Sequence, residues 1–364
     1  MEPRSDAARL NHGPPCDAPV LTAGARSTSR RRWLRIGAGA LLAVAIACGP
    51  RAPLNASPAG ASSGTGGREA APGPAAAAPQ YAVGLRVLRF TVPGRTISLR
   101  HGHVEPLTLT TYVRYPALGA SHGSDGQGAP AAGASGPFPL IVFAHGFDVT
   151  PATYARLLDA WARAGYVVAA PLFPLTGART PGGPEESDVV NQPGYLSFVI
   201  SRLLEASALA AGPMAGLIDP AHIGVAGQSD GGETVLALAD SRRLRDPRIA
   251  AAVVLSGAEL SDIGGYNFTP GGPPLLAAQG TADPSNEPRF TYAFFKAAQR
   301  PKYLLRLLGA EHLPPYTREQ PYLGVVERVS VAFFDAYLKR SALALQQLGS
   351  LGDVSRVSTL LAEP

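Results

Sequence analysis

The chain has 364 residues, of which 46% are hydrophobic and 16% are charged. This composition supports a substantial buried core and excludes disorder of the whole chain, and the length suits one large or two small domains. The formal net charge of +5 is unevenly placed, because residues 1–48 hold seven arginines and three acids. The remainder is nearly neutral, so no basic stripe argues for binding to nucleic acid.

The N-terminal segment is typical of an export signal. Residues 29–35, Ser-Arg-Arg-Arg-Trp-Leu-Arg, precede an apolar run over 36–47, which is short for a membrane span but suits a signal-peptide core. The basic run resembles a twin-arginine signal, and the Ala-Ile-Ala-Cys that ends at Cys48 resembles a bacterial lipobox. We therefore expect residues 1–48 to be a signal peptide and Cys48 to be lipidated, which would anchor an exported protein to a membrane. An ordinary cleaved signal peptide is the alternative.

Cysteine usage agrees with this interpretation. The chain has two cysteines. Cys16 would be removed with the signal peptide and Cys48 would carry the lipid, so no thiol would remain in the folded part. This excludes a zinc or iron–sulfur site built on cysteine, and we expect no cofactor and no metal.

Two low-complexity stretches flank the first predicted strands. Residues 49–80 form an Ala/Gly/Pro/Ser tract that we expect to be a disordered linker. Two β-rich runs follow, over 85–90 and 107–113, and the Pro-Gly turn between them predicts antiparallel strands. Residues 119–136 are again low in complexity and predict an exposed loop.

From residue 138 onward, apolar strands alternate with segments of helical spacing. Such alternation predicts an α/β domain with a mostly parallel sheet covered by helices on both faces. We place this domain at 81–345 and leave 346–364 as a tail without a structural signal. The predicted strands are 140–144, 166–170, 222–226, 249–255, 275–278 and 303–308, and the predicted helices are 151–164, 189–206, 233–240, 287–299 and 323–338.

The pattern Gly-x-Ser-x-Gly occurs three times, centred on Ser62, Ser121 and Ser229. It is the pattern of a nucleophile elbow, which holds a serine on a sharp turn between a strand and a helix. Only Ser229 follows an apolar β-branched run and precedes a helix-like segment, whereas the other two lie in Gly/Ala/Ser-rich stretches. Ser229 is therefore the predicted nucleophile.

A serine hydroxyl needs a base, and the base needs an orienting acid. His312 is the predicted base, because it follows Ser229 in the chain and lies just after the last predicted strand. Asp283 is the predicted acid, because it follows an apolar strand and a glycine turn. Asp262 is its rival, and Glu311 is too close to the histidine in sequence. An ordinary loop histidine and a solvated turn aspartate are the alternatives.

A tetrahedral oxyanion needs two or more hydrogen-bond donors. The residue after the nucleophile supplies one through its backbone N–H, which is that of Asp230. The second is expected from the loop after an earlier strand, where Gly146 allows a tight turn and the N–H of Phe147 points into the site. We expect His145 to brace this loop through hydrogen bonds rather than to act as a base.

These motifs resemble a known fold in their order and spacing. Residues 138–147, 165–171, 219–229 and 280–283 carry a resemblance to the α/β-hydrolase fold that extends over 138–340. The nearest likeness is to bacterial esterases grouped with chlorophyllases, platelet-activating-factor acetylhydrolases and polyester (cutinase-like) hydrolases. The resemblance implies a serine esterase with a Ser-His-Asp triad.

Two residues beside the nucleophile depart from this family pattern. Gln228 stands where relatives often have histidine, and Asp230 stands where many polyester hydrolases have methionine. A carboxylate at the second position would oppose a nearby oxyanion unless it turned away or were held by the N-terminus of the following helix.

We therefore expect an exported serine hydrolase that cleaves carboxylic esters of small molecules, lipids or polyesters through an acyl-enzyme. Loops over 171–188 and 256–274 are expected to form the rim of the site. No insertion long enough for a lipase lid is evident, which favours short-chain or accessible esters. The alternatives are an acyltransferase or a peptidase on the same triad, and a non-catalytic binding lipoprotein.

Lipidation of Cys48 is testable by fractionation. Replacing Cys48 with serine should release the protein from membranes, because a serine hydroxyl cannot carry the thioether-linked lipid that would anchor the chain. Immunoblots of membrane and soluble fractions measure this, and unchanged fractionation of the Cys48→Ser protein would contradict lipidation.

Overall fold

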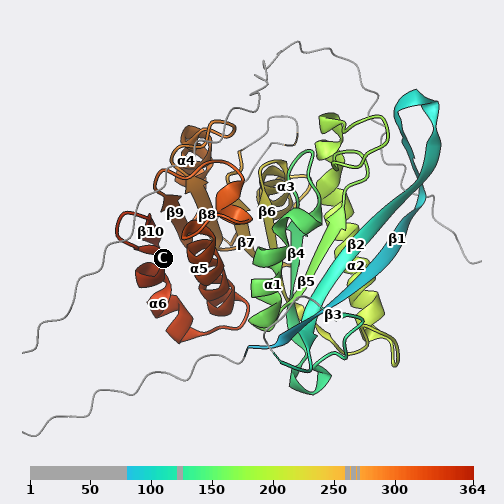
Figure 1. Cartoon of the computed structure of the whole chain (residues 1–364), viewed down its shortest axis with the longest axis horizontal. Helices are drawn as coiled ribbons and strands as arrows, with labels where there is room; N and C mark the ends of the chain where they lie inside the picture. The colour runs from blue at the N-terminus through green and yellow to red at the C-terminus, as the bar shows by residue number, and fades with distance from the viewer. Residues whose placement is uncertain (1–79, 121–125, 259–262, 264–267, 269–270) are drawn as a thin grey trace, which may run out of the picture. The chain divides into compact units, whose positions relative to one another are not determined.

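One ten-stranded sheet forms the centre of the computed structural model, which describes residues 80–364 apart from 121–125, 259–262, 264–267 and 269–270. Its strand order is β10-β9-β8-β7-β6-β4-β5-β2-β1-β3 (Figure 1). The strands are β1 (Ala82–Ser98), β2 (Val104–Ala117), β3 (Gly126–Gln127), β4 (Phe138–Ala144), β5 (Val167–Leu172), β6 (Ile218–Gln228), β7 (Ile249–Leu255), β8 (Leu275–Gly280), β9 (Lys302–Leu307) and β10 (Ser358–Glu363).

Strand direction divides this sheet into a parallel centre and antiparallel edges. The six strands from β5 to β9 in sheet order are mutually parallel. On one side β2 pairs antiparallel with β5 and with β1, and on the other β10 pairs antiparallel with β9. All carboxyl ends of the central strands therefore meet at one edge of the sheet, which is where ligand sites of open α/β sheets lie.

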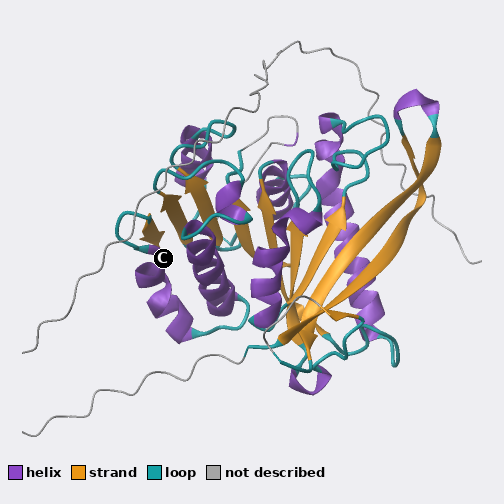
Figure 2. Cartoon of the chain, viewed as in Figure 1, coloured by secondary structure: helices purple, strands orange, loops and turns teal. Residues whose placement is uncertain are grey.

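Helices cover both faces of the sheet (Figure 2). Side chains of α2, α3 and α4 pack on one face, and side chains of α1, α5 and α6 pack on the other. The arrangement agrees with the predicted α/β-hydrolase fold. The helices are α1 (Ala155–Arg163), α2 (Gln192–Ala208), α3 (Asp230–Asp240), α4 (Pro288–Ala297), α5 (Tyr322–Tyr337) and α6 (Ala342–Gly352).

Alternation along the central strands explains why two separate cores form. In β4, Leu140 and Val142 face the core beneath α2 and α3, whereas Ile141 and Phe143 face the core beneath α1 and α5. Successive strand residues point to opposite faces, so a strand buried on both sides must be apolar throughout. The uninterrupted apolar runs in the sequence are thus the direct consequence of a doubly covered sheet.

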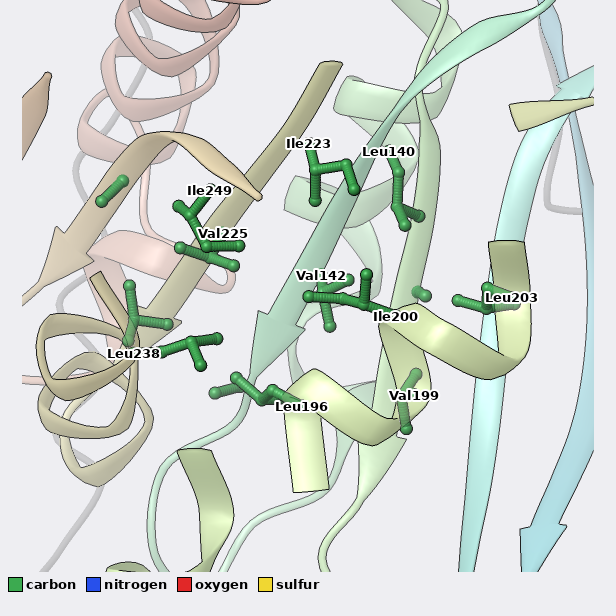
Figure 3. Close-up of a cluster of buried hydrophobic side chains, with 14 of the residues drawn as sticks. Leu140, Val142, Leu196, Val199, Ile200, Leu203, Ile223, Val225, Leu238 and Ile249 are labelled. Atoms are coloured by element: carbon green, nitrogen blue, oxygen red, sulfur yellow. The ribbon is translucent and has the colours of Figure 1, made fainter. Parts of the chain in front are cut away.

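Most side chains of the core beneath α2 and α3 are aliphatic. Figure 3 shows residues of β4, β6 and β7 packed against the inner sides of the two helices. Burial of each such side chain stabilises the fold by about 1.5–3 kcal/mol relative to exposure. The labelled members are Leu140, Val142, Leu196, Val199, Ile200, Leu203, Ile223, Val225, Leu238 and Ile249.

The core on the opposite face is richer in aromatic rings. Trp161 of α1 meets Phe334 of α5 edge to face, with ring centroids 5.6 Å apart. The indole N–H of Trp161 donates to Ser330 Oγ at 2.8 Å, which satisfies the one polar atom that this side chain buries. These contacts fix α1 against α5.

Most expected strands and helices are present, with ends shifted by a few residues. Two regions differ from expectation. Nothing in the sequence beyond Gly349 predicts an element, yet the chain continues through the end of α6 and forms β10 at the sheet edge. Within the expected loop over 119–136, β3 pairs with β1, and Ala132 is buried. Among the described residues, none of the helices has the length and apolar character needed to span a bilayer.

Candidate active site

Ser229 occupies a strained turn between β6, which ends at Gln228, and α3, which begins at Asp230. Its φ of 56° and ψ of −126° lie in a region that residues with a side chain rarely adopt, at a cost of about 1–3 kcal/mol. The turn lifts Ser229 to the carboxyl edge of the sheet, where it is partly exposed. This is the strand-turn-helix context that separates Ser229 from the matches at Ser62 and Ser121. Those two serines lie outside the described residues.

Both glycines of the Gly-x-Ser-x-Gly pattern are required by close backbone contacts. A Cβ added to Gly227 would lie 2.1 Å from the carbonyl oxygen of Gly231. A Cβ added to Gly231 would lie 2.1 Å from the carbonyl oxygen of Ala144, at the end of the neighbouring strand β4. Real carbon–oxygen contacts never approach this distance, so only glycine fits at either position.

His312 and Asp283 reach the serine from two other strand ends. His312 Nε2 lies 2.9 Å from Ser229 Oγ, and His312 Nδ1 lies 2.8 Å from Asp283 Oδ2. Asp283 follows β8, and His312 follows β9. The hydrogen bonds are consistent with a proton on Nδ1, which leaves Nε2 free to accept the serine proton. The structure therefore brings together the three residues predicted from the sequence, with the histidine between the serine and the aspartate.

The carboxylate of Asp283 is held ionised by its surroundings. Its side chain is fully buried, and burial by itself raises the pKa of Asp283. The hydrogen bond and charge of His312 outweigh burial and lower the pKa below its usual value. Backbone N–H groups of Ser285 and Asn286 donate to Asp283 Oδ1 at 2.9 and 3.0 Å, which also favours the charged form.

Two buried glutamines support this arrangement, and sequence reasoning assigned no role to either. Gln228 Nε2 donates to the carbonyl oxygen of His312 at 3.0 Å, and its Oε1 accepts from Tyr154 at 2.6 Å. Gln279 Nε2 donates to Asp283 Oδ2 at 3.2 Å, and its Oε1 accepts from Thr291 at 2.6 Å. Their positions next to the elbow and the acid turn are visible in the sequence, but the sequence does not identify their distant partners.

The loop after β4 brings a backbone donor to the site. Phe147 is partly exposed, and within the described residues its N–H has no acceptor. A Cβ on Gly146 would lie 3.2 Å from the Cβ of Ser229, so this glycine allows the loop to pass close to the nucleophile. Phe147 directly follows this glycine, and its unoccupied N–H is available to an oxyanion at Ser229.

His145 braces that loop and is not available as a base. Its Nε2 accepts the N–H of Phe173 at 3.0 Å, so the proton resides on Nδ1, which donates to the carbonyl oxygen of Gly146 at 2.8 Å. Burial lowers the pKa of His145 to about 4, which keeps the ring neutral. These contacts match the expected bracing role.

Asp230 is the unusual member of the group. Its side chain is buried, and Oδ2 has no hydrogen-bond partner among the described residues. Burial and, to a smaller extent, the charge of Glu186 raise its pKa to about 7 against the opposing effects of His312 and its own backbone N–H. The carboxyl group is therefore enclosed next to the nucleophile in sequence rather than turned to solvent.

The rival residues and the expected rim are only partly described. Asp262 lies outside the described residues, as does Tyr266 of the expected rim. The rim over 171–188 joins the oxyanion loop directly, since Asp148 N–H donates to Thr176 O at 2.9 Å. Within the described part of the chain, no cluster of three or more His, Cys, Asp or Glu residues could hold a metal ion.

Comparison with known proteins supports the general class. The model of the Chlorophyllase family matches residues 129–255, which span β4 to β7 and include Phe147 and Ser229 but not Asp283 or His312. No curated protein matches the chain. With the sheet topology, the match confirms the α/β-hydrolase fold and indicates a serine hydrolase of that type, with an ester as the general substrate class. The finer likeness to acetylhydrolases and polyester hydrolases stays a prediction.

The elbow contact can be tested by its effect on stability. Gly231→Ala should destabilise the domain by at least about 3 kcal/mol, because the added methyl group meets the backbone of Ala144. Gly194→Ala in α2 is the control, since open space surrounds Gly194 and alanine in a helix stabilises by up to about 1 kcal/mol. Thermal melts compare the two, and a Gly231→Ala protein as stable as the control would contradict the contact.

Proposed function

We propose that this protein is a serine esterase that hydrolyses carboxylic esters through an acyl-enzyme. The observation that carries the proposal is the hydrogen-bonded chain from Ser229 through His312 to Asp283 at the carboxyl edge of the sheet. No observation favours transfer to another acceptor, peptide cleavage or a purely binding role over ester hydrolysis.

In the first half-reaction, Ser229 Oγ attacks the ester carbonyl carbon while His312 Nε2 takes the hydroxyl proton. The carbonyl oxygen becomes an oxyanion that accepts hydrogen bonds from the backbone N–H groups of Phe147 and Asp230. The ionised Asp283 stabilises the imidazolium that forms. When the tetrahedral intermediate collapses, the carbon–oxygen bond to the alcohol breaks, and His312 gives its proton to the leaving alcohol.

In the second half-reaction, a water molecule attacks the acyl-enzyme and His312 again accepts the proton. A second oxyanion forms in the same position. Its collapse breaks the bond to Ser229 Oγ, and the proton held by His312 returns to the serine. The products are a carboxylic acid and an alcohol, and the enzyme returns to its starting state with water as the co-reactant.

The surroundings of the serine support small or accessible esters as substrates. Ser229 and His312 are partly exposed, so the reacting atoms are open to a ligand in this structure. The proposal of export and lipid anchoring rests on the sequence of residues 1–48, and it places the esterase outside the cytoplasmic membrane. Its substrates would then be extracellular or membrane-borne esters, including lipids and polyesters.

Labelling with a fluorophosphonate probe tests the proposed nucleophile. The wild-type protein should form a stable covalent adduct, and Ser229→Ala should form none, because the probe reacts only with an activated serine. Ester turnover should fall at least about 10⁴-fold in the same variant. A correctly folded wild-type protein that is neither labelled nor active would overturn the proposal.

Replacing His312 or His145 should affect catalysis to different degrees. His312→Ala should reduce kcat about 10⁴-fold or more, since no other base among the described residues hydrogen-bonds to Ser229 Oγ. His145→Ala should leave residual activity, within roughly 10²-fold of wild type, because His145 only braces the oxyanion loop. Steady-state kinetics on a p-nitrophenyl ester series measure both, and equal losses would refute this division of roles.

A further inference from the structure

The carboxyl group of Asp230 is a buried acid that the proposed reaction does not use. Asp230 is 8% exposed, and its Oδ2 has no partner among the described residues. The group belongs to the residue that directly follows the nucleophile, at the start of α3. The backbone N–H of the same residue is one of the two donors that the oxyanion requires, so an ionised side chain would hold a negative charge near the oxyanion.

The charged groups around Asp230 do not neutralise it. Glu186, in the rim segment after β5, adds a second negative charge, and Tyr154, from the segment before α1, interacts electrostatically with the group. His312, from the loop after β9, acts in the opposite direction and lowers the pKa of Asp230 by charge, but burial outweighs this effect.

We infer that Asp230 works as a neutral carboxylic acid, and that its ionisation opposes the oxyanion that forms beside it. The inference rests on the proposed function, because it concerns the oxyanion of that reaction. In the neutral form, the side chain of Asp230 carries no charge that opposes the substrate oxyanion. In the ionised form, the carboxylate opposes the oxyanion by charge.

The charge of Asp230 determines how turnover should depend on pH. Burial, with the charge of Glu186, raises the pKa of Asp230 to about 7. Below that pH the acid is neutral and compatible with turnover. Above that pH a negative charge develops beside the oxyanion. At an effective dielectric constant of about 20, the repulsion between two such neighbouring charges is large enough to slow turnover by roughly ten-fold or more. Turnover should therefore decline on the alkaline side.

The experiment compares pH profiles of kcat from pH 5 to 10 for the full-length protein with a water-soluble p-nitrophenyl ester. Wild type should lose roughly ten-fold in kcat above about pH 7. Asp230→Asn should show no such decline relative to its own kcat at low pH, because the amide has the shape of the neutral acid and cannot ionise. Glu186→Gln should move the decline to lower pH, because the exposed like charge that keeps Asp230 neutral has been removed.

Asp240→Asn is the matched control. Asp240 ends the same helix, is also buried, and has a pKa raised by burial to about 6, but it lies at the opposite end of α3 from Ser229. Above about pH 4 both carboxyl groups are ionised in the unfolded chain but still neutral in the folded protein, so the free energy of unfolding of wild type should fall as the pH rises. Each asparagine variant should lack its share of this fall. Only Asp230→Asn should also change the kcat profile.

Each outcome decides the inference. An alkaline decline that persists in Asp230→Asn, or one that disappears equally in Asp240→Asn, overturns it while leaving the esterase proposal intact. A wild-type protein without turnover that depends on Ser229 overturns both. Loss of the decline in Asp230→Asn alone, with normal fluorophosphonate labelling, supports the neutral acid.

Discussion

The close approach of Gly231 to the carbonyl of Ala144 is the constraint on which the rest of the site depends. With 2.1 Å between that oxygen and the place a Cβ would occupy, the start of α3 lies directly against the end of β4. The chain after β4 is the oxyanion loop, and the chain before α3 is the nucleophile turn. One backbone contact therefore fixes Phe147 relative to Ser229, and the parallel pairing of β4 with β6 keeps both at the same sheet edge.

Close backbone contact also sets the position of the base. A Cβ on Gly280 would lie 2.5 Å from the carbonyl oxygen of Ala310, so the turn before Asp283 packs against the loop that carries His312. Ala282 N–H donates to that same oxygen at 3.0 Å. The buried amides of Gln228 and Gln279 then tie the two loops to the elbow and to α4. Such a network holds side chains within hydrogen-bond distance only if every member is satisfied, which these partners achieve.

Sequence patterns predicted the parts of this structure that depend on burial and on backbone geometry. Apolar runs such as 249–255 are strands because both faces of the sheet are covered, and the glycine pattern around Ser229 reports backbone contacts that exclude a Cβ. Chain order at strand ends was enough to identify His312 and Asp283 as neighbours of the serine. Each of these signals is local, or follows from the topology of a parallel sheet.

Long-range polar contacts have no comparable local sequence pattern from which they could be predicted. Nothing local distinguishes Gln228 as the residue that links Tyr154 to the His312 loop, because its partners are separated from it by 74 and 84 residues. Strand β10 was missed for a related reason. It is a short edge strand with one solvent-facing side, and its pairing with β9 is decided by the neighbouring strand rather than by its own periodicity.

Two carboxyl groups flank the same catalytic atoms, and their surroundings set them apart. Asp283 is surrounded by donors, namely His312, the amides of Ser285 and Asn286 and the side chain of Gln279, so burial is outweighed and the charge is stabilised. Asp230 is equally enclosed but has an orphan oxygen and faces another acid, so burial dominates. When the surroundings shift the pKa values of two carboxyl groups in one site in opposite directions, one group acts in its ionised form, here to orient the histidine, and the other acts as a neutral acid. The methionine that many polyester hydrolases carry after the nucleophile is neutral at every pH. The acid found here is equivalent to it only while it holds its proton.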